Sequence, residues 1–172
     1  MAAKTYTVMN SAMVTTAAPT KVTTGTSAKT MIQLKASMPI RIIEYGISFD
    51  GSAAATPGIV ELIDAGTVFA TVTAFAAADV MPYSDPNALA NTAGTSGVPL
   101  NLGTAASGYT ASVEGSITAT RMLDLQLIAP TGEYLKQFPL GREPEIVAGN
   151  SLRIRVTFGT AVNALCYVTF EA

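Results

Sequence analysis

The chain has 172 residues, of which 49% are hydrophobic, 7% are aromatic and 13% are charged, and its net charge is −2. A single domain of this length buries about 70% of the surface that its unfolded chain exposes. No apolar run reaches the roughly 18 residues that a membrane-spanning helix needs, and no basic field attracts nucleic acid, so we expect neither a membrane nor a nucleic-acid partner. The apolar surplus is therefore expected in a core or between subunits.

Residues 1–28 are rich in Thr, Ala and Ser, and we expect an extended N-terminal arm ahead of one domain over residues 29–172. All charges before Glu44 are positive, namely Lys4, Lys21, Lys29, Lys35 and Arg41. Two interpretations stay open: the arm docks on an acidic protein surface, or its lysines keep a flexible segment in solution. The start of the chain lacks the apolar region of a secretory signal, so synthesis in a cytoplasm is expected.

Residues 30–36 and 40–50 are the first two confident strands, because apolar side chains alternate along both. In the second, Tyr45, Ile47 and Phe49 share one face. Gly46 lies on the opposite face and predicts a bulge or a close approach to the backbone. Residues 59–64 are expected to return as the partner strand of a wide hairpin.

Residues 66–82 fit both helical and strand spacing, and we favour a strand followed by a loop. Residues 82–108 are rich in Pro, Gly, Ser and Asn and are longer than an ordinary connection, which is typical of a loop that makes functional contacts. Strands follow at 109–118, 120–129 and 134–138. In the second of these, the leucines are expected to face inward, namely Leu123, Leu125 and Leu127.

The C-terminal residues 152–158 and 163–171 give the strongest local pattern and predict a core hairpin. Leu152, Ile154, Val156 and Phe158 alternate with Arg153, Arg155 and Thr157, so the first set is expected in the core and the second on the opposite face. Cys166 is in phase with apolar neighbours and is interpreted as a small buried hydrophobe. With about eight to ten strands and no strong helix, the chain is expected to be all-β, with a jelly-roll-type antiparallel β-sandwich.

Catalytic chemistry has few candidates in this sequence. The chain has no histidine and one cysteine, which excludes Ser-His and Cys-His nucleophiles and zinc sites. Glu44 and Glu61 would face each other across the predicted hairpin as a glycosidase pair, although solvent-facing strand positions explain them better. Asp79, with Asp85 and Asn87, is interpreted as turn-capping rather than calcium-binding. We therefore expect no enzyme, no cofactor and no metal.

Arg142 and Glu143 lie in a rigid connector between Gly141 and Pro144. One interpretation makes them partners across a subunit contact, because a guanidinium can grip a carboxylate twice. The other makes them an internal clamp that holds the connector to the edge of the sandwich.

Several blocks, in their order and spacing, resemble the capsid decoration, or cement, proteins of tailed bacteriophages that infect actinobacteria. The blocks are IIEYGISFDG at 42–51, PYSDPN at 82–87, PLGREP at 139–144, LRIRVT at 152–157 and VNALCY at 162–167. The resemblance covers most of residues 40–171 and fades over the arm. It implies a jelly-roll protomer that forms homotrimers on the outside of the virion and binds the major capsid protein, reinforcing the shell.

From this resemblance, shell contact is expected around Lys4, Tyr6 and Lys21 in the arm. The subunit interface is expected to hold four side chains, namely Arg142, Arg153, Arg155 and Tyr167. The alternative function is a tail-associated or receptor-binding jelly-roll module, whose 82–108 loop would bind host glycan.

Overall fold

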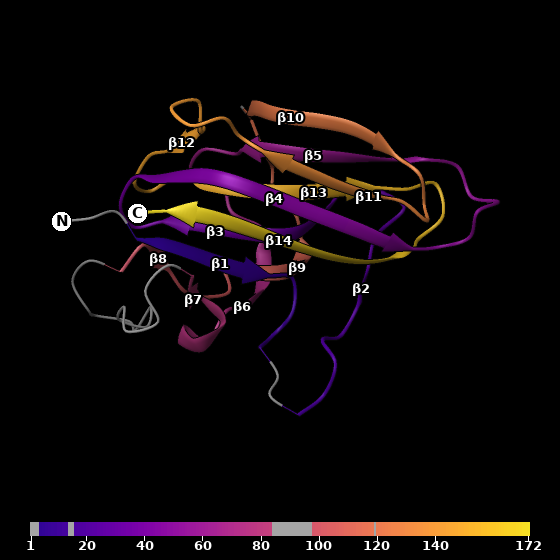
Figure 1. Ribbon diagram of the computed structural model, residues 1–172, viewed down its shortest axis with the longest axis horizontal. Helices are drawn as coiled ribbons and strands as arrows, with labels where there is room; N and C mark the ends of the chain where they lie inside the picture. Colours follow the sequence, from indigo (N-terminus) through magenta and orange to yellow (C-terminus); the bar gives the residue numbers. More distant parts are fainter. Residues whose placement is uncertain (1–3, 14–15, 84–97, 119) are drawn as a thin grey trace.

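The computed structural model describes residues 4–13, 16–83, 98–118 and 120–172. In these residues the strands form two antiparallel sheets, here called sheet A and sheet B, and the predicted all-β sandwich is confirmed. Figure 1 shows sheet A crossing in front of sheet B. The described parts contain no helix of the length and hydropathy that a membrane span requires.

Sheet A has the strand order β11-β4-β14-β1-β7, with β12 beside β4 and β2 beside β14. Its strands are β1 (Thr5–Met9), β2 (Val22–Thr23), β4 (Ile40–Asp50), β7 (Met81–Pro82), β11 (Glu133–Gln137), β12 (Glu145–Ile146) and β14 (Asn163–Glu171). Sheet B has the order β10-β5-β13-β3-β9-β6, with β8 beside β3. Its strands are β3 (Lys29–Ala36), β5 (Gly58–Asp64), β6 (Thr71–Ala74), β8 (Leu100–Asn101), β9 (Gly108–Val113), β10 (Arg121–Ile128) and β13 (Ser151–Thr157).

The long strands pair from the two ends of the chain towards its middle. Strand β1 pairs with β14, β3 with β13, β4 with β11, and β5 with β10. Successive strands mostly alternate between the two sheets, so the chain is a long folded hairpin rolled into a sandwich. This is the jelly-roll arrangement expected from the sequence.

The core lies between the sheets and follows the alternation in the sequence. On β13, Leu152, Ile154 and Val156 are fully buried in it, as predicted. On β14, Cys166 is buried with Val168 and Phe170, which confirms its interpretation as a small core side chain. Burial raises the pKa of the Cys166 thiol, so this cysteine stays protonated and unreactive.

Both predicted hairpins are wrong. Strands β4 and β5 lie in different sheets, and so do β13 and β14. Strand β4 pairs instead with β14, and β5 pairs with β13. Alternation requires only that one face of each strand lies in the core. Two consecutive strands meet this requirement when they pair in one sheet, and equally when the chain crosses from one sheet to the other between them.

The first part of the predicted arm contains strand β1. This strand lies between β14 and β7 as an integral part of sheet A. The Tyr6 ring is 4% exposed and stacks on Phe170 with ring centroids 5.6 Å apart. Lys4 and Ala172 exchange two backbone hydrogen bonds of 2.9 Å, which tie the two ends of the described chain together.

Strand β10 also departs from the expectation, because its leucines do not all face inward. A bulge between Met122 and Asp124 changes the pairing with β5, so that Leu125 lies opposite Glu61 and Leu127 opposite Ile59. Leu125 is 53% exposed and Leu127 is 68% exposed. One extra residue in a strand moves every later side chain to the other face.

The chain between β5 and β10 covers one side of the sandwich. Strands β6, β8 and β9 extend sheet B beside β3, and β7 extends sheet A beside β1. A short 3₁₀ turn, η1 (Ala77–Asp79), lies between β6 and β7. On the opposite side, β10 and β11 are the outermost strands of their sheets, and Figure 1 shows the two sides far apart.

Candidate interaction surfaces

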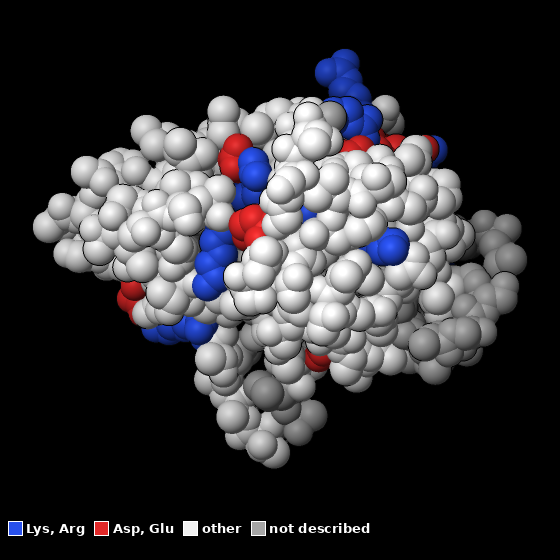
Figure 2. Space-filling view, turned by 180° about the vertical axis from the view of Figure 1, so that it is seen from behind, with Lys and Arg blue, Asp and Glu red and all other residues white. Residues whose placement is uncertain are grey.

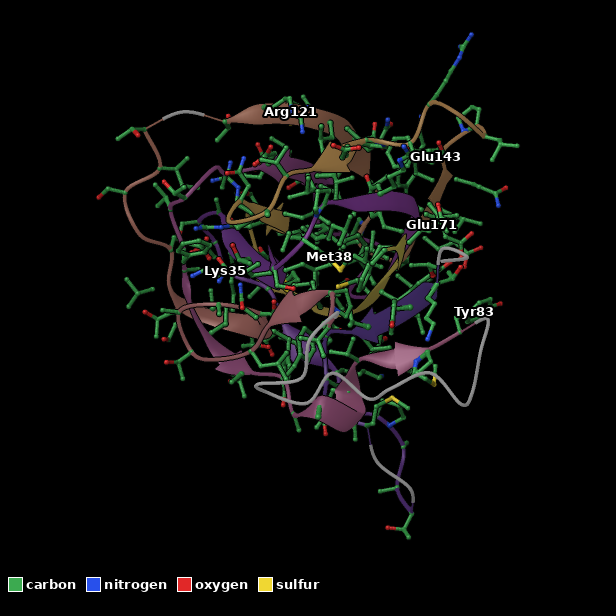
Figure 3. All side chains as sticks on the ribbon, turned by 90° about the vertical axis from the view of Figure 1, so that its left-hand side faces the viewer. Lys35, Met38, Tyr83, Arg121, Glu143 and Glu171 are labelled. Carbon is green, nitrogen blue, oxygen red and sulfur yellow. The ribbon has the colours of Figure 1, made fainter. Side chains whose placement is uncertain are left out.

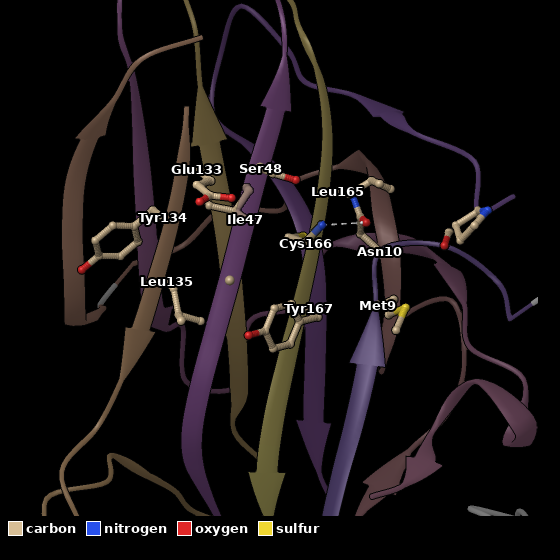
Figure 4. Close-up of a pocket in the computed structure, with 13 residues that line it drawn as sticks. Met9, Asn10, Ile47, Ser48, Glu133, Tyr134, Leu135, Leu165, Cys166 and Tyr167 are labelled. Atoms are coloured by element: carbon tan, nitrogen blue, oxygen red, sulfur yellow. Dashed lines mark hydrogen bonds between the residues drawn. The ribbon is translucent and has the colours of Figure 1, made fainter. Parts of the chain in front are cut away.

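A groove of about 560 Å³ lies on the outer face of sheet A. Its lining comes from β4, β11 and β14, from the end of β1 and from Pro19. Figure 4 shows Leu135, Tyr167, Leu165 and Met9 around it. Apolar side chains of β11, β14 and the end of β1 point outward here. This face is therefore unlike the polar outer face that an antiparallel sheet usually presents to water.

The floor of the groove depends on Gly46. Leu135 and Tyr167 are its cross-strand neighbours on β11 and β14. A Cβ atom at position 46 would lie 2.4 Å from Cε1 of Tyr167, so the tyrosine ring rests directly on the β4 backbone. The close approach predicted at Gly46 is confirmed, and it creates an aromatic floor.

The Tyr167 hydroxyl fixes the ring by donating a hydrogen bond of 3.2 Å to Oε1 of Glu44. Burial, together with the Glu44 carboxylate, raises the pKa of Tyr167. The phenol therefore stays neutral and remains a donor. Glu44 is held on sheet A by this contact and does not face Glu61, which lies on sheet B.

Asn10 forms the wall of the groove beside β14. Its side-chain Nδ2 donates to the Ala164 carbonyl at 3.1 Å, and its Oδ1 accepts from the Cys166 N–H at 3.0 Å. The amide therefore satisfies two strand backbone groups where the β1 ladder ends. Figure 4 shows the second of these bonds as a dashed line.

Glu133 lies on the rim of the groove at the start of β11. Its cross-strand neighbour is Ser48, which is itself opposite Leu165. The carboxylate is exposed, and no described cation lies within ion-pair distance of it. The groove therefore combines an apolar floor with an unneutralised negative charge at its rim.

A second apolar surface runs along the outer face of β10, and we call it the β10 strip. It consists of Met122, Leu125, Leu127 and the neighbouring Ile59 of β5, all exposed. Figure 2 shows the side behind Figure 1, where uncharged side chains form continuous areas and charged groups gather separately. An exposed apolar edge strand is a site for association unless another surface covers it.

A polar cluster closes the sandwich between the two edge strands. Asp124 of β10 accepts hydrogen bonds from the hydroxyls of Tyr45 at 2.9 Å and Tyr134 at 2.8 Å. It also accepts from the Leu125 N–H at 3.0 Å and from Nε2 of Gln126 at 3.1 Å. One backbone donor of β10, the Leu125 N–H, is therefore already occupied within the chain.

These bonds shift the pKa values of the cluster in opposite directions. Burial alone would raise the pKa of Asp124, but the four donors outweigh it and lower the pKa below 3.8. Burial and the Asp124 carboxylate raise the pKa of Tyr134 to about 12 and raise that of Tyr45 as well. One carboxylate therefore holds two neutral phenols across the seam between β10 and β11.

The connector at residues 139–142 forms a projecting turn that we call the knob. Leu140 at its tip is 98% exposed, and Arg142 is also exposed. Figure 3 shows this connector, near the labelled Glu143, extending beyond the strands. The Glu143 carboxylate accepts from the Gly141 N–H at 2.8 Å, so it clamps its own turn, whereas Arg142 has no ion-pair partner among the described residues.

Two of the arginines expected at a subunit interface bind within the chain instead. Arg153 is 0% exposed and donates to the carbonyls of Glu114 at 2.9 Å and Val68 at 2.6 Å. Arg155 pairs with Glu61 at 3.0 Å. Segments near Val68 and Glu114 cover the outer face of β13, which is why a strand alternating apolar and charged residues has both faces buried.

The three residues expected to contact a capsid occupy different environments. Tyr6 is buried in the core, which removes its side chain from external contact. Lys21 is exposed and forms an ion pair with Asp50 of β4, so this part of the chain is fastened to sheet A. Lys4 is half-buried beside the last residue of the chain.

Asp79 behaves as a turn cap, accepting from the backbone N–H groups of Met13 at 2.7 Å and Ala76 at 2.8 Å. Asp85, Asn87 and most of the 82–108 loop lie outside the described residues. Among those described, no group of three potential metal-ligating side chains comes together.

Tyr167 and Arg142, expected at a subunit interface, lie on the surfaces described above, whereas the exposure of Leu125, Leu127 and Leu140 was not expected. Leu125 and Leu127 were assigned to the core. Asp124 and Gln126 alternate with the leucines. Alternation alone shows that the strand has two different faces, but it does not show which of them points inward. Leu140 between a proline and a glycine was a signal of exposure, since a turn leaves a large side chain uncovered.

No family model matches the chain, and no curated protein matches its sequence. Among solved structures, a mutant VP2 protein of infectious bursal disease virus in T=1 particles aligns with 14% identity and a TM-score of 0.19. Other T=1 particles derived from this virus align with 11% identity and a TM-score of 0.21. Both alignments cover 99% of this chain but only 39% and 40% of the other chains. Scores this low carry no argument about fold or function.

Proposed function

We propose that this protein is a structural virion protein that binds the outer surface of a phage capsid and reinforces it. The observation that supports this function best is the β10 strip, in which Leu125, Leu127 and their neighbours stay exposed on an edge strand. The proposal makes the strip the surface that binds the major capsid protein. It also includes self-association, with a homotrimer as the expected form.

The physical basis of reinforcement is the interface added at each site. A specific protein contact buries about 1,200–2,000 Å² in total, and a strip of large apolar side chains supplies the centre of such a contact. Many copies on one shell then act together, because avidity multiplies modest individual affinities. The proposed role needs no catalytic group, cofactor or metal.

The segments that carry the resemblance to cement proteins form the framework of the sandwich. Residues 42–51 lie on β4 and its end, and residues 152–157 lie on β13. Residues 139–144 include the knob, which is a surface feature. The resemblance therefore supports a shared scaffold together with at least one shared exposed turn.

Co-sedimentation tests the proposal. Purified protein is mixed with phage heads that lack it, centrifuged, and compared with a Leu125→Ser/Leu127→Ser variant. The wild type is expected to pellet with heads, and the double variant to lose most of this binding. A Val113→Ser variant is the matched control, because Val113 is 61% exposed but lies on β9, which is separated from β10 by three strands of sheet B.

A wild-type protein that stays in the supernatant would remove the capsid proposal. Retention by host cell wall without heads would favour the tail-associated or glycan-binding alternative. Equal binding by the wild type and the double variant would instead remove the β10 strip from the contact.

A further inference from the structure

Two features of sheet A and its connector carry opposite charges that find no partner within the described chain. The chain has five arginines, all of them described, and Arg41, Arg121, Arg153 and Arg155 each form an ion pair. Arg142 of the knob is the exception. On the groove, Glu133 is exposed and likewise lacks a described cation.

The knob has a defined shape before any partner arrives. Gly141 has a φ of +80°, a conformation that glycine adopts at little cost. The Arg142 N–H donates to the Pro139 carbonyl at 2.9 Å, and the Glu143 carboxylate accepts from the Gly141 N–H. The turn thus presents Leu140 and Arg142 with little further ordering required on binding, which favours association.

The groove offers the complementary pattern. Leu135, Leu165 and the ring of Tyr167 provide an apolar surface, and Glu133 is two residues from Leu135 on the same face of β11. Residues two apart on a strand are separated by about 7 Å. Leu140 and Arg142 lie on either side of Gly141 in one tight turn, so an apolar contact and an ion pair can form together.

The knob cannot fill the groove of its own chain. Strand β11 runs from the groove at Glu133–Leu135 towards the knob, and five further residues of extended chain span about 17 Å. The connector continues from there into β12, which pairs with β4 at Arg41 and Ile40. The turn therefore lies beyond the far end of β11, directed away from the groove.

We propose that the knob of one copy inserts into the sheet A groove of a second copy. Leu140 contacts Leu135, Leu165 and Tyr167, and the Arg142 guanidinium pairs with the Glu133 carboxylate. The two patches are different, so the contact is heterologous and joins copies head to tail. Such contacts close into a ring when the rotation between copies permits it. The inference rests on the self-association in the proposed function but is independent of capsid binding.

Sedimentation velocity of the purified protein over a wide concentration range, without heads, tests this contact. The wild type is expected to associate. Arg142→Glu and Glu133→Arg are each expected to weaken association at least tenfold, because each places like charges together. The Arg142→Glu/Glu133→Arg double variant is expected to recover most of the wild-type association, since it restores the pair in reverse.

Two further variants separate this contact from general effects. Leu140→Ser is expected to weaken association as strongly as the charge reversals, because it empties the apolar part of the groove. Lys29→Glu changes net charge as much as Arg142→Glu but lies on β3, so it is expected to associate as the wild type does.

A wild type that stays monomeric at every concentration would overturn the inference, as would an Arg142→Glu variant that associates normally. Failure of the double variant to recover, with circular dichroism showing folded protein, would also overturn the Arg142–Glu133 pair. Because heads are absent, none of these outcomes depends on whether the β10 strip binds a capsid.

Discussion

The two sides of the sandwich are closed in different ways. On one side, the long connection between β5 and β10 adds strands beside β3 and β1, so the original sheet edges are covered by more sheet. On the other side, β10 and β11 remain edge strands, and the Asp124 cluster bridges them. The core is covered on both sides. On the side of β10 and β11, however, the edge strands and the β10 strip are not covered by further strands.

This difference indicates how a chain with few charges can keep specific surfaces for association. The covered side uses added strands to remove its edges from solvent. The open side keeps Leu125 and Leu127 exposed while Asp124 occupies the Leu125 N–H.

The largest expected effect is where the long connection between β5 and β10 lies over the outer face of β13. Replacing Arg153 by Ala removes the buried guanidinium that donates to the backbone carbonyls of Val68 and Glu114 and pairs with the Glu114 carboxylate. That carboxylate then lacks its cation. The free energy of unfolding is expected to fall by about 3–5 kcal/mol, measured by urea denaturation. Arg41→Ala, which breaks an exposed pair with Glu145, is the control and is expected to cost less than about 1 kcal/mol. Similar losses for the two variants would contradict this account.

The next effect concerns the seam on the open side. Asp124→Ala leaves the hydroxyls of Tyr45 and Tyr134 without their acceptor. We expect a loss of about 1–3 kcal/mol in the free energy of unfolding, because Tyr45 is buried. A Tyr134→Phe variant, which removes one donor and leaves no buried orphan, should lose less. Near-ultraviolet circular dichroism should also report the released tyrosine rings.

The same seam predicts a pH dependence at both extremes. The folded pKa of Asp124 is lowered, so its contribution is present above 3.8 and is lost as pH falls below that value. The folded pKa of Tyr134 is raised, so its contribution is present below pH 10 and is lost as pH rises towards about 12. Thermal unfolding should show both slopes in the wild type, and Asp124→Asn should reduce the acid slope. An unchanged acid slope in Asp124→Asn would assign it to other carboxyl groups.

The smallest effect on stability is expected at the groove floor. Gly46→Ala places a methyl group against the Tyr167 ring and displaces it from Glu44. Because the ring can turn outward, the free energy of unfolding should change by only about 1 kcal/mol. Self-association should nevertheless weaken, since the aromatic floor moves. Thr71→Ala, at an exposed position on β6 of sheet B, should change neither measurement.

The sequence by itself determined most of the long strands and, for most of these, which side chains enter the core. The pattern on β13 and β14 required only local alternation, so Leu152, Ile154 and Cys166 were placed correctly. Gly46 was also readable, because a glycine inside a long strand marks a close approach. These features depend on a side-chain period of two, which is local in the chain.

Only the tertiary structure decided which strands pair and what covers their outer faces. Alternation is identical for a hairpin and for a sandwich corner, so β13 and β14 could not be assigned to separate sheets from their own residues. Arg153 is buried because Val68 and Glu114, distant in sequence, lie over β13. Leu125 is exposed because a one-residue bulge reverses the faces of β10. The surfaces proposed for binding arise from these long-range arrangements, which no local pattern specifies.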